Sequence, residues 1–114
     1  ELSTGTRRIV DLGCVLLARP AVVLLDEPSS GIAQREAEAL GPLLRDIRDE
    51  FGCAMVVVEH DMPLLLGIAD RLYALETGTV VAFGAPDAVI HHPEVVRSYL
   101  GDDLAAINRS GIAG

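Results

Sequence analysis

Apolar residues follow two different spacings in the first half of the chain, and each spacing predicts a type of element. Four segments carry the signal in order: helical spacing at 3–18, an unbroken aliphatic run at 22–25, helical spacing at 34–50 and a second aliphatic run at 54–58. Short aliphatic runs without alternation are typical of strands that are buried on both faces of a parallel sheet. The order predicts a helix followed by a strand–helix–strand unit with two parallel strands.

Shorter patterns fill the second half of the chain. In order, they predict a short helix from Pro63 through Ala69, a hairpin over 71–83 with a turn at Thr77-Gly78, and small helices that begin at Pro86 and at Pro93. Residues 102–114 are small and polar, which predicts a flexible tail. The complete order of elements is typical of an α/β fold.

Polar side chains follow both predicted strands at the point where each strand ends. Asp26 and Glu27 come directly after the first strand, and Glu59, His60 and Asp61 come after the second. Because the carboxyl ends of parallel strands meet at one edge of a sheet, we expect these side chains to lie together. Open α/β sheets bind their ligands at that edge.

These residue types suit nucleotide chemistry, and each also has a purely structural alternative. Asp26 could hold a Mg²⁺ ion that bridges nucleotide phosphates, and Glu27 could polarise an attacking water. The alternative is that both acids favour the N-terminus of the following helix. His60 could donate to a phosphate oxygen, or it could be a solvated imidazole at a strand end.

Small hydroxylated residues and a glycine begin the first predicted helix. Ser3, Thr4 and Gly5 there could form an anion-binding helix terminus. N-capping by Ser3 or Thr4 explains the same residues without any ligand. Both interpretations remain open on these residues alone.

Composition narrows the classes of function. The 114 residues carry a net charge of −8, and all nine basic residues are Arg. Such an acidic chain is unsuited to clamping a nucleic-acid backbone. A chain without Lys contains no P-loop of the G-x-x-x-x-G-K-[ST] type.

No apolar run reaches the roughly 18 residues of a membrane span. Cys14 and Cys53 lack C-x-x-C spacing, and we expect both to be small buried thiols.

The order and spacing of these motifs resemble those of ATP-binding cassette (ABC) ATPases over residues 1–101. The matching segments are Leu2-Ser3-Thr4-Gly5-Thr6 for the signature motif, Val22 to Glu27 for the Walker B strand with its catalytic glutamate, Ser30 to Ala33 for the D-loop, Val58 to Asp61 for the switch histidine, and the hairpin through Gly84 with its G-x-[VI]-x-x-x-G ending. Glu59-His60-Asp61-Met62 and residues 96–101 are most similar to the ATPase subunits of branched-chain amino acid importers.

The resemblance implies a partial P-loop NTPase fold, the C-terminal half of a cassette that lacks the Walker A half, over residues 1–101. It implies that Asp26 helps to hold Mg²⁺, that Glu27 is the general base and that His60 contacts the γ-phosphate of ATP. Ser3, Thr4 and Gly5 would contact the γ-phosphate of a nucleotide that is bound mainly by a second ATPase subunit.

For the intact protein, the resemblance implies an ATPase subunit that powers solute transport, of the branched-chain amino acid import type. Its partners would be a second ATPase subunit in a head-to-tail dimer and a transmembrane permease, at the cytoplasmic face of a bacterial membrane, with no nucleic acid. Without Walker A, we expect the 114 residues alone to be inactive and to bind neither ATP nor Mg²⁺ tightly. In the family sheet, the Walker A strand separates the switch-histidine strand from the hairpin side, so we also expect self-association through unpaired strand edges.

Three positions depart from the family pattern. Thr4 and Thr6 replace a glycine and a glutamine of the signature, and Ala33 stands where the D-loop usually ends in Asp. These changes leave a non-hydrolysing nucleotide-binding or regulatory cassette as the alternative function. A DNA-maintenance ATPase of the same superfamily is a second alternative, disfavoured because the chain has neither heptad segments nor a basic surface.

Overall fold

The computed structural model describes residues 3–100, which form two compact units that divide between Ile68 and Ala69. The first unit contains, in order, α1 (Thr4–Leu16), β1 (Val22–Asp26), α2 (Gln34–Phe51), β2 (Ala54–Val58) and α3 (Met62–Ile68). The predicted tail at 102–114 lies outside the described residues. Within residues 3–100, no helix combines the length and the apolar character that a membrane crossing requires.

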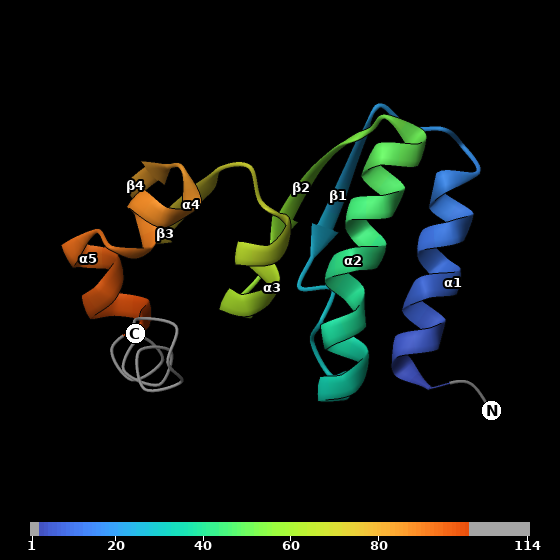
Figure 1. Cartoon of the computed structure of the whole chain (residues 1–114), viewed down its shortest axis with the longest axis horizontal. Helices are drawn as coiled ribbons and strands as arrows, with labels where there is room; N and C mark the ends of the chain where they lie inside the picture. Colours follow the sequence, from blue (N-terminus) through green and yellow to red (C-terminus); the bar gives the residue numbers. More distant parts are fainter. Residues whose placement is uncertain (1–2, 101–114) are drawn as a thin grey trace. The chain divides into compact units, whose positions relative to one another are not determined.

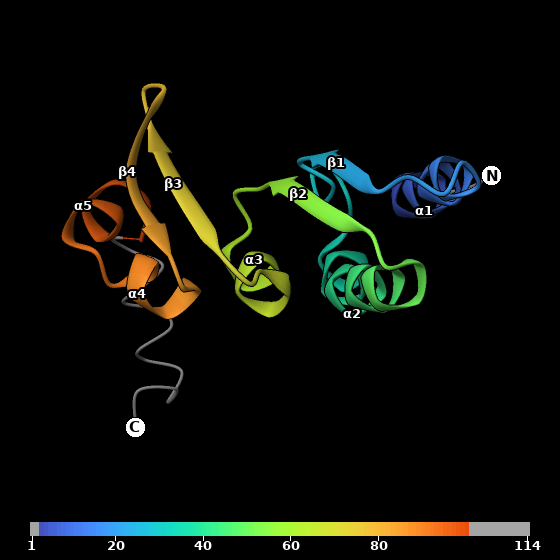
Figure 2. The same ribbon diagram turned by 90° about the horizontal axis from the view of Figure 1, so that it is seen from above.

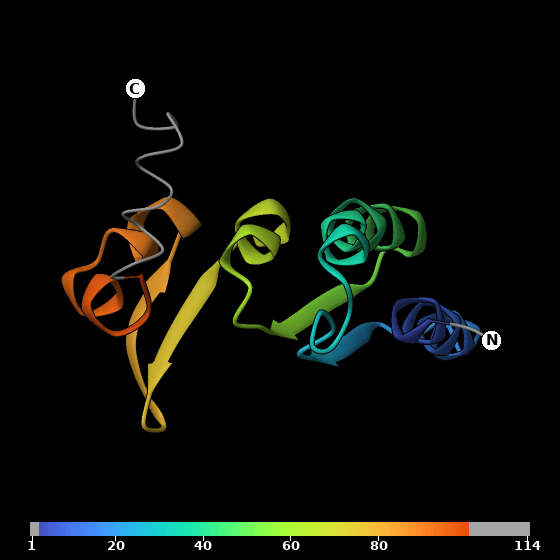
Figure 3. The ribbon, with the colours of Figure 1, turned by 90° about the horizontal axis from the view of Figure 1, so that it is seen from below.

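The sheet of the first unit consists of β1 and β2, which pair in parallel from Val22 opposite Ala54 to Asp26 opposite Val58. Figure 1 shows α1 and α2 running alongside this pair. Seen from above and from below, α2 and α3 lie on the same side of the two strands (Figures 2 and 3). The predicted strand–helix–strand unit is therefore confirmed, with observed bounds within about one residue of those expected.

A small aliphatic core joins the helices to one face of this sheet. Its buried members are Leu12, Leu16, Val23, Leu40, Leu44, Cys53 and Leu64. Leu44 is the most enclosed of them, with only 1% of its surface exposed. Gly41 lies where α2 meets α3, and a Cβ built there would already touch Leu64 at 3.4 Å. The two helices therefore pack at ordinary van der Waals contact beside this glycine.

The opposite face of the sheet is open, which corrects the sequence prediction of strands buried on both faces. Val22, Leu24, Val56 and Val58 are more than half exposed, and Leu24 reaches 75%. Within the first unit, the helices cover only the other face, so the aliphatic runs carry more apolar residues than these helices bury. Cys14 corrects a second expectation, because it is exposed while Cys53 is buried.

The second unit is built on a hairpin of β3 (Leu72–Glu76) and β4 (Thr79–Gly84), followed by α4 (Pro86–Ile90), α5 (Pro93–Val95) and a π-helical turn (Val96–Leu100). Thr77 and Gly78 both have positive φ, of 48° and 79°, as a two-residue hairpin turn with right-handed strand twist requires. Tyr73 and Phe83 stack across the strands with ring centroids 5.0 Å apart. The predicted hairpin is confirmed.

Truncation of Leu44 tests the core directly. Because the side chain is enclosed, we expect Leu44→Ala to lower the free energy of unfolding by about 2–5 kcal/mol. The matched control is Leu17→Ala, at a leucine that is 84% exposed, for which a change within about 0.5 kcal/mol is expected. Urea denaturation followed by circular dichroism measures both. Equal losses for the two variants would contradict the described core.

Candidate functional site

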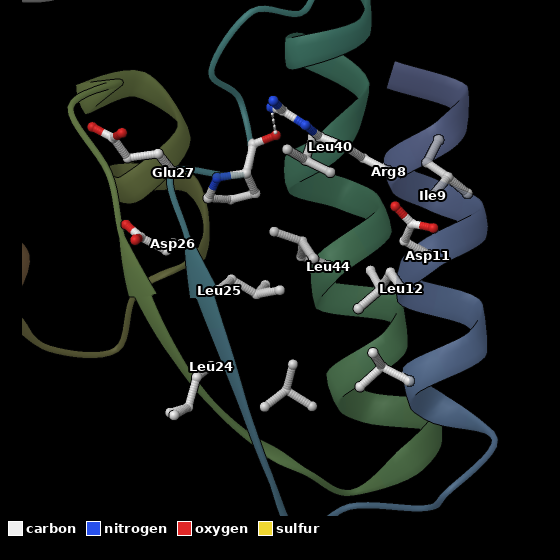
Figure 4. Close-up of a pocket in the computed structure, with 13 residues that line it drawn as sticks. Arg8, Ile9, Asp11, Leu12, Leu24, Leu25, Asp26, Glu27, Leu40 and Leu44 are labelled. Carbon is white, nitrogen blue, oxygen red and sulfur yellow. Dashed lines mark hydrogen bonds between the residues drawn. The ribbon is translucent and has the colours of Figure 1, made fainter. Parts of the chain in front are cut away.

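The carboxyl edge of the parallel sheet gathers the polar residues that follow the two strands. The amide of Glu27 donates to the carbonyl of Val58 at 2.7 Å, which extends the parallel pairing one residue past β1. Figure 4 shows the carboxylates of Asp26 and Glu27 on the side of β1 that faces away from α1. The sequence prediction that both strands end at the same edge of the sheet is confirmed.

Glu27 and His60 are in direct contact at this edge. Nε2 of His60 lies 2.9 Å from Oε1 of Glu27, and the two side chains are 74% and 44% exposed. Glu27 also has a φ of 49°, in the left-handed region that a non-glycine residue rarely adopts. Such a conformation costs about 1–3 kcal/mol and is concentrated at functional sites. The pair is therefore accessible to a ligand and is held in a strained local geometry.

Glu59 ties the loop after β1 to the loop after β2, a role that the sequence did not reveal. Its Oε1 accepts from the amide of Ser29 at 2.8 Å. Its Oε2 accepts from the amides of His60 at 3.0 Å and Asp61 at 3.2 Å. We call these three hydrogen bonds the Glu59 clamp.

The ionisation of Glu59 reflects these contacts. Partial burial of its carboxyl raises the pKa, but the hydrogen bonds from Ser29, Asp61 and His60 together outweigh burial and lower the pKa below its ordinary value. Hydrogen bonds to the charged form act in this direction. Glu59 is therefore a carboxylate at neutral pH, when its oxygens accept from the amides.

The start of α1 makes a second set of contacts, with α2. Ser3 caps α1, because its Oγ accepts from the amide of Thr6 at 3.1 Å, and it also donates to Oε1 of Glu36 at 2.8 Å. Gly5 is buried beneath Glu36, and a Cβ built at Gly5 would overlap its carboxylate. Thr4 is exposed. Ser3 thus provides the N-cap that was one of the two interpretations of these residues, whereas its contact with Glu36 had no signal in the sequence.

Arg8 links α1 to the loop that follows Glu27. Its Nη1 donates to the carbonyl of Pro28 at 2.7 Å, and Figure 4 shows this hydrogen bond beside an open groove of about 290 Å³ between α1 and β1. This contact explains an arginine in the first turns of a helix, where the helix dipole disfavours positive charge. The predicted site residues therefore form two groups within the described part of the chain. Ser3 to Gly5 lie with Glu36 at the start of α1, and Glu27 lies with His60 at the edge of the sheet.

The carboxylate oxygens at the carboxyl edge of the sheet could hold Mg²⁺ only together with a bound ligand such as a nucleotide. Among residues 3–100, no three His, Cys, Asp or Glu side chains are grouped as a metal site. Asp26 alone offers an exposed carboxylate at the end of β1. Mg²⁺ in nucleotide sites is commonly held by one or two carboxylates together with substrate phosphates. Asp26 therefore fits a metal that arrives with a nucleotide.

Comparison with known proteins identifies the chain's relatives. No family model matches it. The branched-chain amino acid transport ATP-binding protein LivG of Escherichia coli (strain K12) is 34% identical over 102 residues, covering 90% of this chain and 40% of LivG. The zinc import ATP-binding protein ZnuC of Halorhodospira halophila is 40% identical over 105 residues, with the same coverage. The chain is a homologue of ABC transporter ATP-binding proteins.

A solved structure supports the same relationship to ABC transporter ATP-binding proteins. The ADP conformation of MJ1267, an ATP-binding cassette of an ABC transporter, superposes with a TM-score of 0.77 at 28% identity, over 90% of this chain and 41% of that one. The chain thus has part of the ABC ATPase fold, a P-loop NTPase fold, as the resemblance implied. It spans about 40% of the length of the relatives that it matches.

The segment Ser30 to Ala33, which resembles a D-loop, enters α2 without a capping side chain. Gly31 has a φ of 74°, which only glycine adopts readily. Ala33 is the N-cap of α2 and makes no side-chain capping hydrogen bond. An Asp at this position could accept from a free amide of the first turn, which typically contributes about 1 kcal/mol.

Acidification tests the Glu59 clamp. Because the folded-state pKa of Glu59 lies below the ordinary value of 4.5, the clamp is complete above that value and is lost as pH falls through the folded pKa. We expect Glu59→Gln to lower the free energy of unfolding more at about pH 7 than at about pH 3. Urea denaturation at the two pH values measures both differences. An equal loss at both would show that the charge of Glu59 contributes no stability.

Proposed function

We propose that this chain is the C-terminal part of an ATP-hydrolysing subunit of an ABC transporter. The observation that carries the proposal is the contact between Glu27 and His60, 2.9 Å apart at the carboxyl edge of a parallel sheet. A carboxylate and an imidazole in contact can divide the work of activating water and of binding a phosphate oxygen. Homology to ABC transporter ATP-binding proteins supports ATP as the nucleotide.

Glu27 is the general base of the proposed reaction. Its Oε1 faces His60, and in the described part of the chain its Oε2 has no hydrogen-bond partner. That oxygen is available to orient a water and to take its proton. His60 holds Glu27 on one side and can turn its exposed ring toward a terminal phosphate. Asp26 would hold Mg²⁺, which neutralises charge on the phosphates when it is bound.

The phosphate cradle must come from residues other than these 114. A chain without Lys has no P-loop lysine, and a P-loop is what surrounds the phosphates in this fold. We therefore expect the chain by itself to be inactive and to bind ATP and Mg²⁺ only weakly. Ser3, Thr4 and Gly5 form a helix start that suits the γ-phosphate of a nucleotide held by a second subunit. For that contact, the carboxylate of Glu36 has to leave Ser3.

The whole subunit would act with partners. A head-to-tail dimer with a second ATPase subunit completes each site, and a permease couples closure of the dimer to movement of a solute, at the cytoplasmic face of a bacterial membrane. LivG is named for branched-chain amino acids and ZnuC for zinc. Residues 59–62 favour transport of the branched-chain amino acid type. The exposed edges of β1 and β2 also favour self-association when the rest of the sheet is missing.

A non-hydrolysing cassette is the alternative, and Ala33 is the observation that favours it. The D-loop carries signals between two ABC sites, and here it enters α2 without a side-chain cap. Thr4 and Thr6 also change the signature. Such a subunit would bind ATP, and its dimer would close, but the ATP would not be hydrolysed.

Glu27→Gln in the whole subunit separates the two functions. Removing the base while keeping its shape should lower the ATPase rate by roughly 10²–10⁴-fold, with ATP retained on the protein after gel filtration. The matched control is Glu50→Gln, at an exposed position on α2, which should hydrolyse at the unsubstituted rate. If the unsubstituted subunit itself retains ATP without turnover, the non-hydrolysing alternative is correct. If Glu27→Gln hydrolyses normally, Glu27 is not the base.

A further inference from the structure

Glu59 accepts hydrogen bonds from both loops of the candidate site. One oxygen accepts from Ser29, in the loop that leaves β1, and the other accepts from His60 and Asp61, in the loop that leaves β2. Asp61 in turn accepts from the amide of Leu64 at 3.0 Å, which fixes the first turn of α3. A single half-buried carboxylate thus joins both loops that carry the reactive side chains.

These contacts close a small ring around the reactive pair. The backbone connects Glu27 to Ser29 through Pro28, the Ser29 amide donates to Glu59, the backbone connects Glu59 to His60, and His60 returns to Glu27 at 2.9 Å. Only two of these connections are non-covalent. Together with the backbone hydrogen bond from Glu27 to Val58, the Ser29–Glu59 hydrogen bond therefore limits how far the Glu27 and His60 side chains can separate.

The charge state of Glu59 suits positioning rather than reaction. Both of its oxygens accept from backbone amides, so neither is free to take a proton from water. The hydrogen bonds also hold the pKa of Glu59 below its ordinary value, in spite of partial burial. A base that is less basic than usual and already fully engaged is unsuited to activating water.

We propose that Glu59 is a positioning residue that sets the geometry of Glu27 and His60 by fixing the loop after β1 to the loop after β2. The proposal rests on the proposed function. A carboxylate is needed because amides approach both of its oxygens. The amide group of a glutamine offers one acceptor oxygen, and its NH₂ group would face a backbone N–H. An aspartate keeps both oxygens but is one methylene shorter.

The test compares Glu59→Gln and Glu59→Asp with the unsubstituted whole subunit. The matched control is Glu38→Gln, because Glu38 accepts only a surface hydrogen bond, from Gln34 at 3.3 Å on the same helix. We expect kcat for ATP hydrolysis, per folded molecule, to fall by roughly tenfold to a hundredfold in Glu59→Gln, as misplacement of reacting groups by about 1 Å does. Glu59→Asp should fall less. KM for ATP should stay within about twofold, since no Glu59 oxygen is free to bind a nucleotide.

Amide hydrogen exchange at Ser29 supplies a readout that does not depend on activity. Exchange should accelerate in Glu59→Gln and stay unchanged in Glu38→Gln. If kcat of Glu59→Gln stays within about twofold of the unsubstituted value, or if KM alone changes, the positioning role is overturned. If Glu59→Gln does not fold, Glu59→Asp takes its place with the same outcomes. If the unsubstituted subunit hydrolyses no ATP, the proposed function is wrong, and the inference that rests on it is overturned too.

Discussion

Parallel pairing of β1 with β2 is the interaction on which the rest of the site depends. Its register sets Asp26 opposite Val58, so that the residue after each strand emerges at the same edge. The amide of Glu27 then completes the pairing with Val58. Glu27 and His60 are far apart along the chain, and this register alone brings their backbones close enough for a side-chain contact. A shift of one residue would turn one of the two side chains to the other face.

Beyond the register, the site relies on hydrogen bonds between loops rather than on the core. Arg8 holds the carbonyl of Pro28, and Glu59 holds the amide of Ser29. The loop after Glu27 is thus fixed from α1 on one side and from the loop after β2 on the other. This double attachment is consistent with the positive φ of Glu27, because a strained residue persists only where its surroundings determine it. The apolar core beneath fixes the helices, and these polar hydrogen bonds fix the loop that follows Glu27.

Much of the fold could be predicted because the signals were local. The aliphatic runs and the Thr77-Gly78 turn each depend on neighbours in sequence. The proximity of the strand-end acids followed from parallel pairing alone. Burial of the strands on both faces was wrong, because an aliphatic run does not specify what covers it. Burial of Cys14 was wrong for the same reason, because its apolar neighbours in sequence do not specify whether another element covers it.

The connecting residues could not be predicted because their roles depend on distant partners. Glu59 was noticed as part of a polar strand end and of a matching segment, but its partner Ser29 lies on another loop and gave no signal. Glu36 reads as an ordinary acid in the first turn of α2, yet it contacts Ser3 and lies against Gly5. A sequence without aligned relatives contains no signal that joins such pairs. The motifs therefore pointed to Glu27 and His60, which are in contact, but not to the residues that hold their loops.

We propose that these 114 residues supply the hydrolytic edge of an ATP site but no cradle for the phosphates. Titration calorimetry with ATP and Mg²⁺ tests this proposal most directly, on this chain and on a form extended at its N-terminus within the same protein. We expect the extended form to bind ATP and the chain alone to give no measurable heat of binding. Tight binding of ATP by the chain alone would contradict the proposal, because the phosphates would then be held by residues other than those assigned to them.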